Sequence, residues 1–355
     1  MNFLFLNIRD TSHPLAGEPE HFVAALAEKI AARGHQVTCL SSQHHQGHDI
    51  SAQNGITYIR RGGENNISSQ ARQFWNDKAS GTTDYVAETV NHKSFATSSY
   101  VPANSRIIFV HQKYNAKSSL DKQITNKQLK PHRHDLVFTT SPHIYDQLNS
   151  SDFGRLYILP PGLVTNVDQV NVPKTVNPTW LYHGSLKAEN NFEDILDAFT
   201  QTLPQYPTST LWVINNEGPT YRQKIVTQAA QLGINNNIRW YSKLSPAQLA
   251  EQYQRAWAII STAPSRGWNA PIYDAANYKT PSIVYNLPGL AESIEHDQTG
   301  LCVTARPHDL AAAMLKLIKF KNLRKLMGHK AGHFAKHFDW HKTANRFLDA
   351  IQPPE

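Results

Sequence analysis

The second half of the chain contains a stretch that decides its fold, AWAIISTAPSRGWNAPIYDAANYKTPSIVYN, residues 256–286. It joins two apolar runs of strand length, AWAIIS and PSIVYN, through a glycine-containing turn and a helix that starts near Pro271. Proline is favoured in the first turn of a helix, because its missing N–H would have no helical partner there. A strand, a helix and a second strand joined by short loops form a parallel crossover. The stretch therefore predicts part of an open α/β sheet, with helix N–H groups presented at a strand's carboxyl end.

The same alternation of strands and helices fills the chain in two series. Apolar runs of strand length occur in the first series at 2–8, 36–42, 56–61, 84–89, 106–112 and 135–141, and in the second at 179–184, 209–215, 237–242, 256–261, 281–286 and 301–304. Residues 165–178 are polar, contain prolines and lack periodicity, which is typical of a linker. We therefore predict two Rossmann-like α/β domains, 1–165 and 179–335. A C-terminal helix within 336–355 is expected to pack back across the domains.

The composition limits the class of protein. With 355 residues, 40% hydrophobic and 18% charged, the chain is typical of a soluble two-domain protein. No apolar run approaches the roughly 18 residues of a membrane span, and the start lacks a cationic leader, so we expect a cytoplasmic location. The formal charge of +7 favours an anionic partner. Cys39 and Cys302 are expected to be small core residues, and the histidine pairs lack carboxylates at ligand spacing, so no metal site is predicted.

Three strings resemble segments of glycosyltransferase family 4, in matching order over nearly the whole chain. They are IRDTSHPLAGEPEHFVAALAEKIAARGHQVTCLSS (8–42), DYVAETVNHKSFATSSYVPANSRIIFVHQ (84–112) and SRGWNAPIYDAANYKTPSIVYNLPGLAESIEHDQTGL (265–301). The last is similar to the REGWG-type donor loop of a bacterial and archaeal branch. The resemblance implies a GT-B fold, in which two Rossmann-like domains face each other across a cleft. It also implies a retaining transfer of a sugar from a nucleoside diphosphate, without a metal cofactor.

By this resemblance the second domain holds the sugar donor, but its charged positions are altered. The family signature Gly-Arg-Leu-x-x-x-Lys is present as GSLKAEN, with Ser185 at the arginine position and Asn190 at the lysine position. Neither residue supplies the positive charge that stabilises a departing diphosphate, and Lys187 either substitutes for them or is an exposed lysine. The two family glutamates are replaced by Arg266 and Asp274. Asp274 can still accept hydrogen bonds from ribose, whereas Arg266 either binds an acidic sugar or the phosphates, or marks a site no longer used.

A turn and two residues of the first domain complete the candidate site. The turn before the helix, which either cradles phosphates or is merely a helix start, comprises Gly267, Trp268, Asn269 and Ala270. Gly17 keeps one glycine of the family's first loop; the second is Glu18, whose carboxylate would repel a diphosphate if it pointed inward. His111 matches the family histidine near the donor sugar and is the candidate catalytic residue. Without the resemblance, it would be read as a strand-end histidine.

Basic residues gather in the first domain with only Asp121 as a counter-charge; they are Arg106, Lys113, Lys117, Lys122, Lys127, Lys130 and Arg133. Such a cluster would hold the protein at an anionic membrane face or meet a phosphorylated acceptor, and a solvated loop is the alternative. Aromatic residues that stack on bases are not interleaved with it, so no nucleic acid partner is expected.

The leading hypothesis is a glycosyltransferase of cell-surface polysaccharide biosynthesis, cytoplasmic or peripheral at the inner membrane face. It would move a sugar from a UDP- or GDP-linked donor to a glycan, a lipid-linked acceptor or a protein, with retention. The alternative is a catalytically inactive GT-B homologue that acts as an accessory or acceptor-binding subunit of a partner glycosyltransferase. No G-x-G-x-x-G opens a helix after a strand, which weighs against a dinucleotide-dependent oxidoreductase.

Overall fold

The computed structural model describes residues 1–45, 47–90, 95–110, 136–148, 155–163, 172–215, 219–264 and 268–352. The chain forms two compact units. Unit 1 comprises Met1–Gly162, Arg266–Trp268 and Asp339–Glu355, and unit 2 comprises Leu163–Ser265 and Asn269–Phe338. The segment expected to be a linker therefore opens unit 2, and the C-terminal helix belongs to unit 1.

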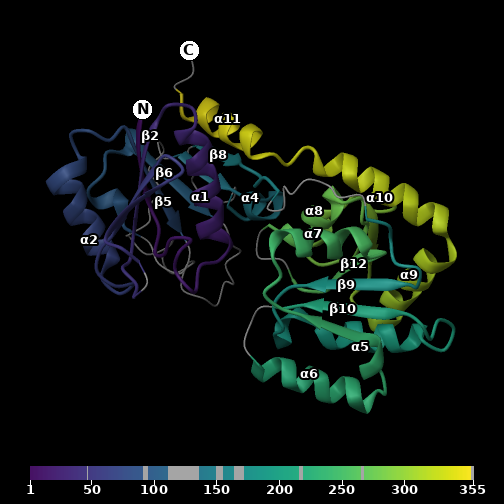
Figure 1. The fold of residues 1–355 in the computed structure, drawn as a ribbon. Helices are drawn as coiled ribbons and strands as arrows, with labels where there is room; N and C mark the ends of the chain where they lie inside the picture. Colours follow the sequence, from purple (N-terminus) through teal and green to yellow (C-terminus); the bar gives the residue numbers. More distant parts are fainter. Residues whose placement is uncertain are drawn as a thin grey trace. The chain divides into compact units, whose positions relative to one another are not determined.

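Unit 1 is built on an eight-stranded sheet with the order β3-β4-β2-β1-β5-β6-β7-β8 (Figure 1). Its strands are β1 (Asn2–Leu6), β2 (Gln36–Ser41), β3 (Ile50–Gln53), β4 (Ile56–Arg60), β5 (Tyr85–Val90), β6 (Arg106–Val110), β7 (Leu136–Thr139) and β8 (Arg155–Ile158). Strand β3 pairs antiparallel with β4, and the other described pairs are parallel. The predictions missed β3 and β8. Asn54 and Gly55 link β3 to β4 with φ of 53° and 81°, as in the two-residue hairpin turns that Asn-Gly favours.

Helices cover both faces of this sheet. Along β1, Phe3 and Phe5 point into the cluster beneath α1 (Glu18–Ala31) and α11 (Trp340–Ile351), while Leu4 points into the cluster beneath α2 (Ile67–Phe74). A π-helical turn, Trp75–Ala79, continues α2, and α4 (Pro142–Leu148) follows β7. Because successive side chains of a strand alternate between faces, continuous apolar strands require helices on both sides. The C-terminal helix α11 thus completes the core of unit 1, where Phe347 stacks on Phe109 with ring centroids 5.8 Å apart.

Unit 2 is built on a six-stranded parallel sheet with the order β11-β10-β9-β12-β13-β14. Its strands are β9 (Thr179–His183), β10 (Thr210–Ile214), β11 (Ile238–Tyr241), β12 (Ala258–Ser261), β13 (Ser282–Tyr285) and β14 (Gly300–Val303). Its helices are α5 (Phe192–Thr202), α6 (Pro219–Gln231), α7 (Pro246–Arg255), α8 (Ala270–Asn277), α9 (Pro307–Lys319) and α10 (Lys321–Ala335). Counted from β9, the strand order is 3-2-1-4-5-6, that of a doubly wound Rossmann sheet. The expectation of two Rossmann-like sheets is confirmed.

Two expectations about side chains are corrected by the structure. Arg106 begins β6 and is only 2% exposed, because the adjacent strands and helices enclose it, so it cannot belong to an exposed basic loop. The other basic residues of that cluster lie outside the described residues. Cys39 is buried on β2 as expected, whereas Cys302 on β14 is only half-buried.

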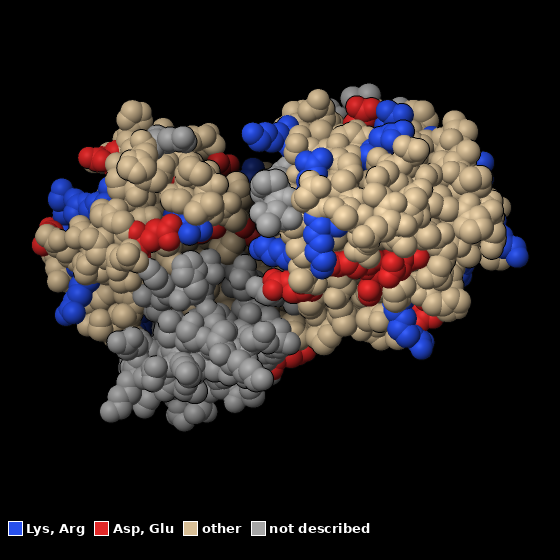
Figure 2. Space-filling model, turned by 90° about the horizontal axis from the view of Figure 1, so that it is seen from below, with Lys and Arg blue, Asp and Glu red and all other residues tan. Residues whose placement is uncertain are grey.

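The charged side chains are interspersed on the face shown in Figure 2, where Lys and Arg alternate with Asp and Glu over both units. Among the described residues, no continuous patch of Lys and Arg covers this face. Throughout the described ranges, every helix is too short or too polar to cross a bilayer.

Candidate functional site

The strand order of unit 2 reverses between β9 and β12, and in sheets of this kind ligands bind beyond the strand carboxyl ends at such a reversal. Two loops leave the sheet there, residues 184–191 after β9 and the loop that starts at Thr262 after β12. The Thr262 hydroxyl donates to the Asn190 carbonyl at 2.7 Å, and the Asn191 amide donates to the Thr262 carbonyl at 3.1 Å. The two loops therefore form one connected rim over the reversal point.

The first loop is closed on itself by two of the predicted site residues. The Asn190 side-chain amide donates to the Ser185 carbonyl at 2.7 Å and to its hydroxyl at 2.8 Å. Both residues are half-buried, and Lys187 between them is exposed at the N-cap of a short 3₁₀ turn. The two positions expected to carry cations therefore hold a neutral hydrogen-bonded pair. Within the described part of this loop, Lys187 supplies the positive charge.

The second loop leads into the start of α8. Trp268 is buried and groups with unit 1, and Asn269 is the N-cap of α8 in unit 2. The Asn269 side chain does not cap the helix, since it donates to the Gly289 carbonyl at 3.1 Å and the Ser293 hydroxyl at 2.5 Å. Ala270 is the first helical residue, and the N-cap side chain leaves the first N–H groups of α8 uncapped.

Asp274 lies in the second turn of α8 and is only 4% exposed. Burial is the larger cause that raises the pKa of the Tyr253 phenol, and the nearby Asp274 carboxyl group raises this pKa further.

Three predicted residues lie outside the described residues; they are His111, Arg266 and Gly267.

The carboxyl ends of β9 and β10 carry two polar residues that the predictions missed. His183 ends β9, and its Nδ1 lies 2.6 Å from the Tyr253 hydroxyl. Burial lowers the pKa of His183 to about 4, so the ring is neutral near pH 7. Asn215 follows β10 and donates to the Gly184 carbonyl at 3.1 Å. The only signal in the sequence is their place at strand ends, because His183 and Tyr253 are 70 residues apart.

In unit 1, the predicted loop glycine is part of a helix cap. Gly17 is the N-cap of α1, and its N–H donates to the Glu20 carboxylate at 2.8 Å. Its φ of −125° is open to any residue, so glycine is not required there by backbone strain. Glu18 follows as the first helical residue, and burial raises the pKa of its carboxyl to about 8. Burial therefore favours the neutral form of the Glu18 carboxyl group, which would weaken the repulsion of a diphosphate that we expected.

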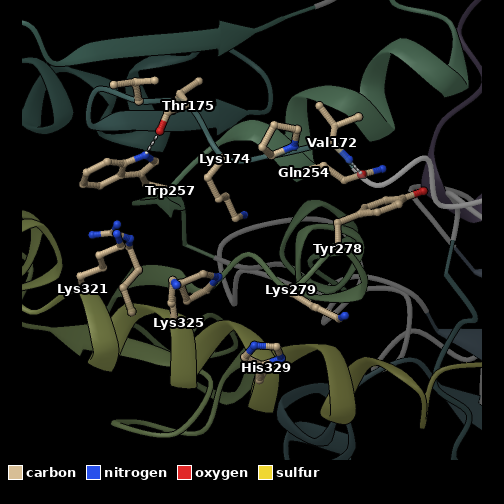
Figure 3. A pocket seen from close by; sticks show the side chains of 14 residues that line it. Val172, Lys174, Thr175, Gln254, Trp257, Tyr278, Lys279, Lys321, Lys325 and His329 are labelled. Atoms are coloured by element: carbon tan, nitrogen blue, oxygen red, sulfur yellow. Dashed lines mark hydrogen bonds between the residues drawn. The ribbon is translucent and has the colours of Figure 1, made fainter.

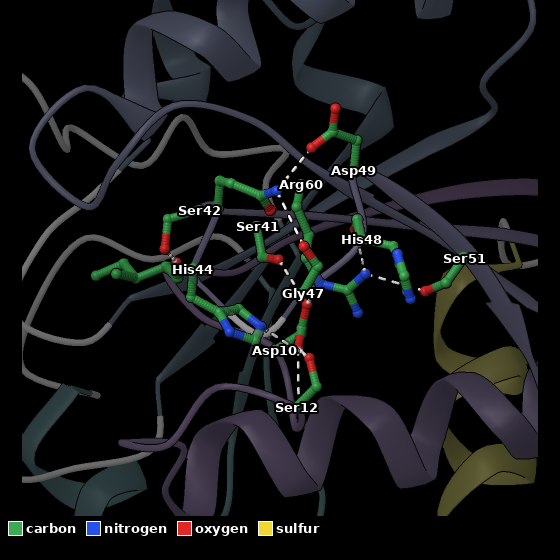
Figure 4. A network of polar contacts seen from close by, with 12 residues as sticks. Asp10, Ser12, Ser41, Ser42, His44, Gly47, His48, Asp49, Ser51 and Arg60 are labelled. Carbon is green, nitrogen blue, oxygen red and sulfur yellow. Dashed lines mark hydrogen bonds and ion pairs between the residues drawn. The ribbon is translucent and has the colours of Figure 1, made fainter.

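A buried polar network lies at the carboxyl ends of β1, β2 and β4 in unit 1 (Figure 4). Arg60 Nε donates to Asp10 Oδ2 at 2.5 Å, and the Ser41 hydroxyl donates to the same oxygen at 3.0 Å. Ser12 donates to Asp10 Oδ1 from its N–H and its hydroxyl at 2.8 and 2.5 Å, and this hydroxyl lies 2.9 Å from His44 Nε2. Burial alone would raise the pKa of Asp10, but the hydrogen bonds from Ser12 and Arg60 outweigh it and hold the pKa below its ordinary value. The network presents Ser12 and His44 at the edge of the sheet.

Residues 165–334 match the family described as glycosyl transferases group 1, which covers the whole of the rim in unit 2. Among curated proteins, the chain is similar to a D-inositol 3-phosphate glycosyltransferase of Corynebacterium jeikeium, with 25% identity over 167 residues. That alignment spans 45% of this chain and 40% of the relative, so less than half of either protein is matched.

Solved structures match over almost the whole chain. A glycosyltransferase from Rickettsia africae superposes with a TM-score of 0.80 at 16% identity, covering 99% of this chain and 98% of that one. Anabaena HepE, solved in complex with UDP, superposes with a TM-score of 0.76 at 15% identity, covering 99% of each chain. This chain has the GT-B fold. In this GT-B protein, unit 2 brings together Ser185, Lys187, Asn190, Asn269, Ala270 and Asp274 around one strand reversal.

Proposed function

We propose that the chain is a glycosyltransferase that binds a nucleoside-diphosphate sugar at the carboxyl edge of β9 and β12. The observation that carries this proposal is the strand reversal in unit 2, where Thr262 ties the two loops together next to the start of α8. The match to glycosyl transferases group 1 over residues 165–334 supports it, since this range contains both loops. The complex of the similar HepE with UDP supports a nucleoside diphosphate as the leaving group.

The residues of the rim have different roles in this proposal. The N–H groups at the start of α8 would face the diphosphate, because a helix N-terminus carries a partial positive charge. Asp274 would accept hydrogen bonds from the ribose, and Lys187 would neutralise part of the phosphate charge. Because Ser185 and Asn190 offer no charge, Arg266 at the other loop is the second candidate cation.

The remaining roles rest on the resemblance of the sequence to family 4. His111 would lie beside the donor sugar, unit 1 would hold a glycan, lipid-linked or protein acceptor, and the reaction would retain the configuration of the sugar without a metal. The polar edge formed by Ser12 and His44 is the part of unit 1 that we assign to the acceptor's hydroxyl groups.

Titration calorimetry of the full chain with UDP, GDP and ADP tests the donor site, and Ala270→Glu is the informative variant. A carboxylate in the first turn suits the helix dipole, so α8 should keep its stability, but it would repel a diphosphate placed there. We expect binding of the preferred nucleotide to weaken at least about tenfold. The control is Ala247→Glu, which adds the same charge in the exposed first turn of α7 and should leave binding unchanged because solvent screens it.

Turnover separates the enzyme from the inactive alternative. Release of nucleoside diphosphate from UDP-linked or GDP-linked hexoses, suppressed by Ala270→Glu and not by Ala247→Glu, would support the transferase. Nucleotide binding with no release in the presence of any acceptor class would favour an accessory subunit. Absence of heat with all three nucleotides would contradict the donor site itself.

A further inference from the structure

Unit 2 contains a pocket of about 830 Å³ at the edge of its sheet opposite the rim. Its walls come from residues that precede β9, β12 and β13, from the end of α8 and from the first half of α10. The pocket therefore lies at the amino ends of the strands, whereas the rim described above lies at their carboxyl ends. It is separate from the proposed donor site.

The lining of this pocket is strongly basic. Its basic members are Lys174, Lys279, Lys321, Arg324, Lys325 and His329, and among the described residues no Asp or Glu lines it. Within the ranges that the structure describes, Lys279, Lys321 and Lys325 have no ion-pair partner, whereas Lys316 on the neighbouring α9 pairs with Asp297 at 3.2 Å. In Figure 3, Lys174 lies in the upper part of the view, whereas Lys279 lies in the lower part, near Lys325 and His329 of α10.

The helix α10 bears an electrostatic cost for this arrangement. Lys321, Lys325 and His329 are four residues apart and share one face of the helix, where the like charges of the two lysines repel. Lys321 is also the first helical residue, and the first turn contains no acidic residue or side-chain cap. Cations at the N-terminus oppose the helix dipole. An anion in the pocket would attract the lysines and offset both their mutual repulsion and their unfavourable interaction with the helix dipole.

The side chains of Arg324 and Lys174 in this pocket are held in place by neutral groups, which do not compensate their positive charge. The Arg324 guanidinium lies 3.6 Å from the ring centroid of Trp257 and donates to the Leu317 carbonyl. The Lys174 ammonium group donates to the Ala256 carbonyl at 2.7 Å and to the Thr280 hydroxyl. Burial, and to a smaller extent the charge of Arg324, lower the pKa of Lys174 to about 7. An anion beside these two groups would favour their charged forms.

Close backbone packing fixes the width of the pocket. A Cβ atom at Gly328 would fall well inside van der Waals contact of the Lys279 carbonyl oxygen, so glycine lets α10 approach the end of α8. Lys279 itself has a φ of 57°, an uncommon conformation for a residue other than glycine. The left-handed conformation of Lys279 closes the end of α8, where the N–H groups of Lys279 and Thr280 donate to the carbonyls of Ala276 and Ala275 at 2.9 and 3.0 Å.

We propose that this pocket is a binding site for a phosphate-bearing ligand. Clustered lysine and arginine donors without carboxylates bind phosphate oxygens through charge-assisted hydrogen bonds, and Trp257 and Tyr278 give the ligand an apolar wall. The phosphate belongs either to a soluble metabolite or to the headgroup of an anionic lipid, and both present the same chemistry to the pocket.

The soluble arm of the test uses pyrophosphate as the probe, with Trp fluorescence and calorimetry on the full chain. The pocket variant is Lys321→Gln/Lys325→Gln, and the control Lys316→Gln/Lys319→Gln on α9 removes the same charge outside the pocket. Ala270→Glu reports on the donor site. We expect a binding event that the pocket variant weakens at least about tenfold and that the control and Ala270→Glu leave unchanged.

The second arm measures sedimentation with vesicles of phosphatidylglycerol and of phosphatidylcholine. Binding to phosphatidylglycerol alone, lost in the pocket variant and reversed by pyrophosphate, would identify a lipid headgroup as the source. Pyrophosphate binding without vesicle binding would identify a soluble ligand. The proposal is overturned if neither probe binds, or if the pocket variant and the α9 control behave alike. Loss of pyrophosphate binding in Ala270→Glu alone would assign the event to the donor site.

Discussion

The packing of α10 on α8 can be tested with two glycines of the same helix. Replacing a helix-interior glycine by alanine normally stabilises a protein by roughly 1 kcal/mol, because glycine loses more backbone entropy on folding. At Gly332, the new Cβ would lie 3.0 Å from Lys279 Cγ, and this flexible side chain can move aside. At Gly328, it would meet the Lys279 carbonyl oxygen, which is fixed by the left-handed turn after α8.

The two substitutions should therefore have opposite signs. Overpacking against rigid atoms costs about 1–3 kcal/mol, so Gly328→Ala should lose up to about 2 kcal/mol after the helix gain is subtracted. Gly332→Ala should be neutral or up to about 1 kcal/mol more stable. Because the protein has two units, hydrogen exchange of peptides from β13, in the core of unit 2, is a better measure than one global transition. A loss of 2 kcal/mol corresponds to about 30-fold faster exchange, and equal or slower exchange in Gly328→Ala than in Gly332→Ala would refute the packing argument.

Two further predictions concern buried polar groups. Asp10→Asn leaves the buried Arg60 guanidinium without its counter-charge and should lower the free energy of unfolding of unit 1 by about 3–5 kcal/mol, measured with urea. The control Asp49→Asn changes an exposed carboxylate and should cost little. Similar losses in both variants would contradict the network. For His183, the folded-state pKa of about 4 lies below the ordinary value of 6.5, so its contribution to stability is present above pH 6.5 and is lost as the pH falls toward 4. NMR titration of the imidazole should show a neutral ring down to pH 5, and a midpoint above 6 would refute its burial against Tyr253.

The sequence predicted the features of the candidate site that follow from a local residue pattern. It did not predict the contacts between residues that are distant in the sequence. The strand, turn and helix around Ala270 could be read from spacing, because apolar runs and Pro271 report local structure directly. The pairing of Ser185 with Asn190 required the path of the loop, and the contact between His183 and Tyr253 required the end of β9 to meet helix α7. Neither leaves a periodic signal in the sequence.

The burial of Arg106 is a second feature that the sequence pattern did not predict. By composition it belongs with the basic residues that follow it in the sequence, yet it starts a central strand and is buried. The sequence pattern of a charged residue at a strand end is the same whether that residue is buried or exposed, because burial depends on which neighbours cover it.

The sequence by itself determined the two α/β sheets, since buried parallel strands must be continuously apolar and each needs a helix to return the chain. It also determined where the loops at the strand reversal lie. Only the tertiary structure decided that α11 completes the core of unit 1, and that Lys174, Lys279 and the basic face of α10 surround one pocket. These features join residues that are far apart in the sequence or depend on a close approach such as that at Gly328, so they follow from packing and not from local propensity.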